Sequence, residues 1–117
     1  MIKMENERGI ISIASSVFTT LVGDAATRCF GVRGMAFRSV SDGLVHLLKR
    51  ESMGKGVEIV YNEDMSISID LHIIIEQGVN IPVLCNSIMS EVRYKVSSAT
   101  NAAIKNIDIY IDSIILD

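Results

Sequence analysis

The sequence predicts a single α+β domain, with helices packed on one face of a mostly antiparallel sheet. A run of alternating apolar and polar residues over Met65–Ile75 is typical of a strand that buries one face. A shorter alternating run, Val57–Tyr61, precedes it across the turn signal Asn62-Glu-Asp64, so residues 57–75 are expected to form a β-hairpin. Segments with apolar residues at helical spacing lie before and after this hairpin. The expected order of elements is therefore β-α-(α)-β-β-α-β.

The N-terminal residues are expected to form a tail and then a strand. Residues 1–8 are polar and mixed in charge, which predicts a flexible tail ahead of a domain that spans residues 9–117. The run Gly9–Ala14 predicts a short strand. Ser15 or Ser16 can then cap a helix, because a side-chain oxygen accepts a hydrogen bond from a backbone N–H that the helix itself leaves unpaired.

The first helix and the segment after it come next. The helix is expected to run to about Phe30, where Gly31-Val-Arg-Gly34 ends it, because glycine supplies the left-handed conformations found at helix ends. The segment Met35–Arg50 indicates a second helix with Ser41 or Asp42 as its cap, although a glycine within it disfavours the helix by ~1 kcal/mol relative to alanine. Met53-Gly-Lys-Gly56 predicts a flexible connection to the hairpin.

The second strand of the hairpin separates two kinds of side chain. Its polar face is expected to carry Ser66, Ser68, Asp70 and His72. The face expected to be buried carries Met65, Ile67, Ile69, Leu71, Ile73 and Ile75. Ile74 breaks the alternation, which indicates that the far end of the outer face is also covered.

The C-terminal third is expected to hold a turn, a long helix and a strand. Gly78 turns the chain, Asn80 can cap the helix, and Pro82 is tolerated in the first turn, where its missing N–H costs nothing. Ser97–Ala103 ends the helix, with Asn101 available for a left-handed cap. The final strand, Lys105–Leu116, is expected to place Ile107, Ile109 and Ile111 on one side and Asp108 and Asp112 on the other.

Composition and charge exclude several classes of protein. The 117 residues are 49% hydrophobic and 21% charged, which is typical of a globular domain. A net charge of −3 indicates no general affinity for nucleic acid or for an anionic membrane surface. No apolar run is long enough to cross a membrane. We therefore expect a cytoplasmic protein without direct membrane insertion, which reaches the membrane only through a partner.

The sequence contains no recognisable constellation for catalysis or metal binding. Cys29 and Cys85 fall on apolar helical stripes, which favours buried free thiols. His46 and His72 have no ligand-spaced Cys or His beside them, as a zinc site would require. We expect no enzyme activity, and we assign no catalytic, cofactor-binding or metal-binding residue.

The Gly-x-x-Gly segment supports one alternative function. The KH class of RNA-binding domains clamps the nucleic-acid backbone with such a loop between two helices, and the order β-α-α-β-β-α resembles that class. In this alternative, Gly31, Arg33 and Gly34 would contact nucleic acid, with Arg28 and Arg38 nearby. The plainer interpretation is a glycine-terminated helix followed by a tight turn, because short motifs recur by chance and the chain is acidic.

Taken together, the motifs resemble the alkaline shock protein family, the YloU-like group of envelope stress response proteins. The resemblance covers residues 9–116. One departure is the segment Ser97–Ala103, where the family usually has a glycine-containing turn. The matching segments are Gly9–Ala14, Gly31–Ala36, Asp42–Leu44, Gly54–Val57, Ile67–Ile75, Glu76–Pro82 and Ile107–Ile111.

The resemblance implies a non-enzymatic protein of bacterial cell-envelope homeostasis or stress response. Family members are expected to act by self-association or by docking on a protein partner, including a membrane-anchored envelope protein. The family has no agreed catalytic residues or cofactors to carry over. From the residues themselves, the final strand Lys105–Leu116 can pair with another chain if its edge is uncovered.

Overall fold

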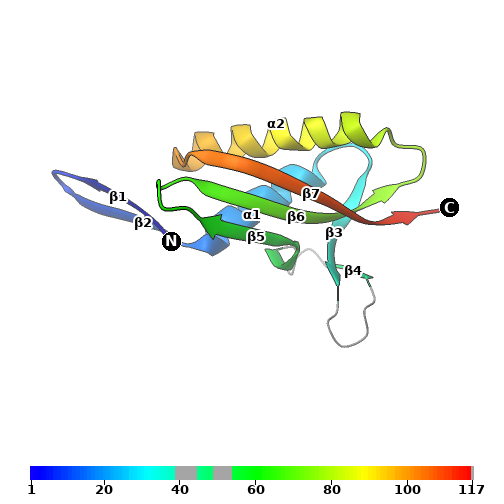
Figure 1. Ribbon diagram of the computed structural model, residues 1–117, viewed down its shortest axis with the longest axis horizontal. Helices are drawn as coiled ribbons and strands as arrows, with labels where there is room; N and C mark the ends of the chain where they lie inside the picture. Colours follow the sequence, from blue (N-terminus) through cyan, green and yellow to red (C-terminus); the bar gives the residue numbers. More distant parts are fainter. Residues whose placement is uncertain (39–44, 49–53, 117) are drawn as a thin grey trace.

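In a computed structural model, the described residues, 1–38, 45–48 and 54–116, form a mixed α+β domain, as predicted (Figure 1). Two helices pack on one face of a five-stranded sheet, and a separate two-stranded hairpin projects from one end. The elements in chain order are β1 (Ile2–Asn6), β2 (Gly9–Ile13), α1 (Ser15–Thr27), β3 (Val32–Arg38), β4 (Val45–Leu47), β5 (Val57–Tyr61), β6 (Ile67–Glu76), α2 (Ile81–Thr100) and β7 (Ile104–Ile115).

Strand β6 is the centre of the main sheet. On one edge it pairs with β7 in parallel along Ile67–Glu76, while β5 and β3 share its other edge and β4 extends the sheet from β3. All pairings except β6–β7 are antiparallel, so the prediction of a mostly antiparallel sheet is confirmed. β7 is parallel because α2 returns the chain to the starting end of β6, which is how parallel neighbours are connected.

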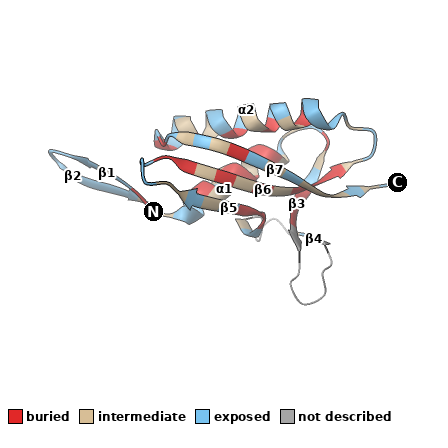
Figure 2. Cartoon of the chain, in the orientation of Figure 1, coloured by how far each residue is buried: buried red, intermediate tan, exposed pale blue. Residues whose placement is uncertain are grey.

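The inner face of β6 forms the floor of the core. Its five apolar side chains at Ile67, Ile69, Leu71, Ile73 and Ile75 have no exposed surface, as the alternating pattern predicts (Figure 2). They pack against apolar residues of the helices, among them Phe18, Val22, Leu84, Ile88, Val92 and Val96. The expected burial of Ile74 is confirmed at 4% exposure. Met65 was expected on the same buried face but lies in the preceding turn, with φ 71° and 58% exposure.

The two helices begin in different ways. The Asn80 side chain accepts a hydrogen bond from the Val83 N–H at 3.1 Å, Pro82 sits in the first turn of α2, and Asn101 ends α2 in the left-handed conformation at φ 60°. These three predictions are confirmed. Helix α1 differs, since its N-cap is Ala14 with no side-chain cap, and Ser15 already lies within the helix. It also ends at Thr27, earlier than expected.

Two predictions about strands and helices are wrong. The segment expected to be a flexible tail forms β1, which pairs with β2 and places Ile2 in the core at 4% exposure. A helix was expected within Met35–Arg50, after a cap at Ser41 or Asp42, but Val45–Leu47 of that stretch form β4. β4 pairs with β3, and β3 pairs in turn with the distant β6 on its other edge. A short local apolar pattern does not outweigh that long-range pairing. The expected caps, Ser41 and Asp42, lie outside the described residues.

Candidate interaction surfaces

The face of the main sheet opposite the helices is polar. The strand register places Glu58 of β5, Asp70 of β6 and Asp108 of β7 side by side across three strands. Partial burial raises the pKa of Asp70, and the neighbouring carboxylates of Asp108 and Glu58 raise it further. This row of carboxylates makes the face unsuited to an anionic ligand such as a nucleic-acid backbone.

His72 lies two residues beyond Asp70 along β6, on the same face as the carboxylate row. Its Nδ1 is 2.9 Å from an Asp112 carboxylate oxygen, and its ring stacks on Tyr110 with the ring centres 4.8 Å apart. Within the described ranges, no group of three or more His, Cys, Asp or Glu side chains is arranged to hold a metal ion. The contacts of His72 instead join β6 to β7.

The two cysteines are poor candidates for nucleophiles. Burial raises the pKa of the Cys29 thiol, and the Glu91 carboxylate raises it further, while burial alone raises the pKa of Cys85. The Cys29 thiol donates to the Ala25 carbonyl at 3.6 Å. Because the thiolate is the reactive form, both thiols stay largely protonated and unreactive at neutral pH.

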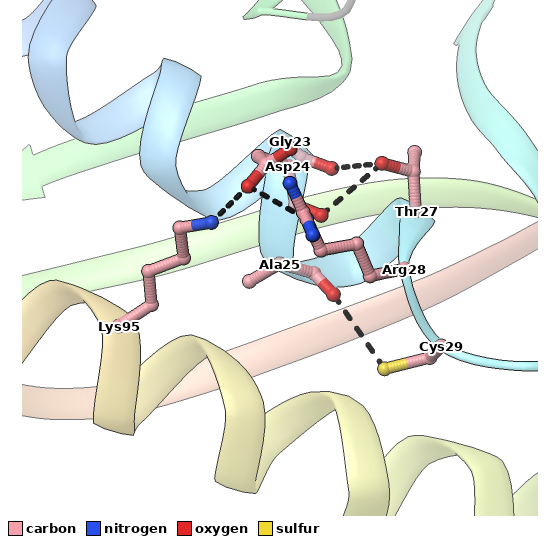
Figure 3. A network of polar contacts seen from close by, with 7 residues as sticks. All are labelled: Gly23, Asp24, Ala25, Thr27, Arg28, Cys29 and Lys95. Atoms are coloured by element: carbon pink, nitrogen blue, oxygen red, sulfur yellow. Dashed lines mark hydrogen bonds and ion pairs between the residues drawn. The ribbon is translucent and has the colours of Figure 1, made fainter.

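A network of polar contacts joins the two helices (Figure 3). The Asp24 carboxylate of α1 accepts hydrogen bonds from Arg28 Nε, at 3.0 Å, and from Lys95 Nζ of α2. The hydrogen bond from Lys95 is the main reason that the pKa of Asp24 is lowered. The Thr27 hydroxyl donates to the Gly23 carbonyl at 2.8 Å within the same turn. Of these contacts, the one between Lys95 and Asp24 joins α1 to α2, while the others stay within the C-terminal end of α1.

The Gly-x-x-Gly segment lies at the start of β3 and not between two helices, so the predicted KH-like setting is wrong. A Cβ atom on Gly31, whose φ is +102°, would approach Val79 Cγ2 to 2.8 Å, and one on Gly34 would approach Leu47 Cδ1 to 2.8 Å. The half-exposed Arg33 side chain lies 4.0 Å from the Glu76 carboxylate. Close packing therefore accounts for both glycines.

A groove with both apolar and polar lining residues opens between the end of α1, the turn after β6, and α2. Its volume is about 780 Å³. Phe30, at its mouth, is 92% exposed, and Val83 on its wall is 62% exposed. The sequence alone does not indicate this groove. The one available signal is the aromatic residue directly before the glycine segment. The remaining lining residues are Arg28, Cys29, Glu76, Gln77, Gly78, Val79, Asn80, Leu84, Ser87 and Glu91.

The outer edge of β7 is unpaired within the part of the chain that the structure describes. This strand has 12 residues and pairs only with β6 there. In a parallel ladder, backbone groups that do not point to the neighbouring strand point outward, so β7 presents a row of donors and acceptors. Ile114 and Leu116, toward its end, are 44% and 71% exposed. The predicted final strand is confirmed.

Comparison with known proteins agrees with this architecture. The model of the alkaline shock protein 23 family, described by a cell envelope-related function, matches residues 3–116. The chain belongs to this family. Protein YloU of Bacillus subtilis (strain 168) is 31% identical over 97% of this chain and 94% of its own length. Protein Spy1614 of Streptococcus pyogenes serotype M6 is 32% identical over 97% of this chain and 93% of its own length. Both relatives are uncharacterized.

A likeness to a solved structure concerns the fold alone. The MamM-CTD fragment 215–293 superposes with a TM-score of 0.51 at 15% identity, over 86% of this chain and 99% of that chain. In this alkaline shock family member, none of the helices that the structure describes is long and apolar enough to cross a membrane.

Proposed function

We propose that this protein is a non-enzymatic interaction module of the bacterial cell envelope, which associates with copies of itself or docks on an envelope partner. The observation that carries the proposal is the uncovered edge of β7. Membership of a family with a cell envelope-related function supports the setting.

The edge of β7 has the features of a surface that accepts another strand. It is long, it contains no proline, and its last five residues carry a single charge, at Asp112. Exposed edges of this kind add strands from other chains, with backbone hydrogen bonds supplying affinity. A charge of −3 gives little attraction to anionic lipid, so we propose that a membrane-anchored protein holds the domain at the cytoplasmic face.

The proposal is tested by sedimentation velocity of the purified chain up to high micromolar concentration, together with cross-linking and recovery from envelope fractions. We expect a concentration-dependent rise in mass, or recovery of a specific envelope protein. A chain that stays monomeric and recovers no envelope protein would contradict the proposal. A variant with lysine at Ile114 and Leu116 should weaken strand addition at this edge, because edge lysines oppose pairing.

A further inference from the structure

We infer that the β1–β2 hairpin of one copy docks into the groove beside Phe30 of another copy, so that copies join head to tail. This inference rests on the proposed self-association and names a surface for it, distinct from the edge of β7. The two parts of the contact are the hairpin tip, with Ile10 and Ile11, and the groove wall, with Val83 and Phe30.

The hairpin is anchored only at its base. Ile2 is buried in the core, and Met4 and Ile13 pack partly against it, while the rest of the hairpin projects from the body (Figures 1 and 2). At the projecting end, Ile10 and Ile11 are 63% and 54% exposed, on opposite faces of the ribbon. A two-stranded hairpin on its own is marginally stable in water. Its exposed isoleucines therefore favour a partner surface that covers them.

The groove lies at the other end of the molecule. The long dimension of the domain is 56 Å, with the hairpin at one end and the turn from β6 to α2 at the other (Figure 1). A hairpin therefore cannot reach the groove of its own chain. At about 780 Å³, the groove is in the size range that takes a compact ligand or several apolar side chains. Phe30, almost fully exposed at the mouth, is available to cover an inserted side chain.

The charges of the groove do not repel the hairpin, and one of them, Glu91, is available to pair with a cation at the hairpin tip. Two of the charged residues that line the groove form ion pairs: Arg28 pairs with Asp24, and Glu76 pairs with Arg33. Glu91 has no ion-pair partner among the described residues, so it leaves the rim acidic.

The hairpin carries the cations Lys3 and Arg8 and the anions Glu5 and Glu7, so it has no net side-chain charge to oppose an acidic rim. Arg8 lies at the tip, two residues from Ile10. A docked tip can therefore place this cation near Glu91 while the isoleucines enter the groove. The hairpin tip and the groove are therefore complementary, and they are two different surfaces of the same chain.

Such a contact extends and does not close on itself. Because the two surfaces are different and lie at opposite ends of the long axis, each added copy presents a new free groove or hairpin. The expected assembly is an open chain of copies. The edge of β7 runs along the side of the domain and stays free for another contact (Figure 1).

The first test uses one variant on each surface. Replacing both Ile10 and Ile11 by lysine puts charges on the contact surface of the hairpin. Val83→Lys puts a charge on the contact surface of the groove. We expect each change to weaken self-association by about tenfold or more, since it places an unpaired charge in the contact. Met65→Lys is the matched control, because Met65 is 58% exposed and lies outside both surfaces. Circular dichroism checks that each variant is folded.

The second test mixes the two variants. Each then retains one intact surface, so an equimolar mixture should form a one-to-one complex that stops at two copies. As a further check, Arg8→Glu and Glu91→Arg should each weaken assembly, and the double variant should recover part of it.

The outcomes separate the inference from the proposed function. A monomeric wild-type chain that recovers no envelope protein overturns both. An assembling wild-type chain whose hairpin and groove variants assemble unchanged, or whose mixture forms no complex, overturns the inference alone. Loss of an envelope partner in Val83→Lys with self-association intact would also overturn it, because another protein would then occupy the groove.

Discussion

The β5–β6 and β1–β2 hairpins both contain stretches of alternating apolar and polar residues, and their surroundings are opposite. In β5–β6, the inner residues of β6 are fully buried under the helices. In β1–β2, the adjacent Ile10 and Ile11 near the tip stay exposed, and only the base reaches the core. Each of these hairpins is followed by a helix: α1 follows β1–β2, and α2 follows β5–β6. Alternation therefore predicts a strand, whereas burial of its apolar face depends on what the rest of the chain places over it.

Truncation of one apolar residue in each hairpin should show the largest difference. Leu71→Ala in β6 is expected to lower the free energy of unfolding by about 2–5 kcal/mol, because it leaves a cavity in a fully buried site. Ile11→Ala in β2 is expected to change it by no more than about 0.5 kcal/mol. Urea denaturation of the dilute, monomeric chain measures both. Equal effects would mean that the tip of β1–β2 is covered within one copy.

Glycine replacements compare the projecting end with the packed end. Gly31→Ala should destabilise the fold by about 1–3 kcal/mol, because φ is +102° and the new Cβ would meet Val79 at 2.8 Å. Gly9 also has a positive φ, but a Cβ atom there would have no neighbour within 4 Å. Gly9→Ala should therefore lower the stability through backbone strain alone. Thermal and urea unfolding should show a larger loss of stability for Gly31→Ala than for Gly9→Ala. The reverse order would contradict the close packing of Gly31 against Val79.

The helix that follows each hairpin offers a third comparison. Asn80→Ala removes the side-chain cap of α2 and should cost about 1 kcal/mol of stability. Ala14→Asp supplies a cap that α1 lacks and should add up to about 1 kcal/mol. Calorimetry and chemical denaturation test the pair. A stability loss in Ala14→Asp would show that this position does not accept a capping side chain.

The contributions of two carboxylates to folding stability should depend on pH in opposite directions, and these are the smallest of the expected effects. The pKa of Asp24 is lowered, chiefly by Lys95, so its ionised form stabilises the fold above its unfolded-state pKa, and this stabilisation is lost as pH falls through the folded-state value. The pKa of Asp70 is raised, chiefly by burial, so its charge destabilises the fold at neutral pH and the penalty disappears in acid.

Asn substitutions isolate these two contributions. At neutral pH, Asp24→Asn should lower stability and Asp70→Asn should raise it, and both differences should shrink as the pH falls toward the carboxylate range. Denaturation curves at several pH values measure the differences. A loss of stability in Asp70→Asn at neutral pH would contradict the unfavourable surroundings assigned to this carboxylate, and a gain in Asp24→Asn would contradict the role of its contact with Lys95.

Much of the fold could be predicted because its signals are local. The alternating pattern of β6, the Asn80 cap, the position of Pro82 and the left-handed Asn101 all depend on neighbours within a few residues. Strand β3 could not be predicted this way, since its first half pairs with β6, far along the chain, and its second half pairs with β4. The groove was missed because it joins α1, α2 and the turn after β6.

The α+β class, the main hairpin, the long helix and the family can all be predicted from the amino-acid sequence, because periodicity, caps and turn residues act over short distances. Three features appear in the folded domain alone: β7 is parallel with a free outer edge among the described residues, the first eight residues contribute a strand, and Phe30 is exposed beside a groove. Strand pairing and burial depend on which distant segments come into contact, and a local pattern does not specify the segments that will cover it.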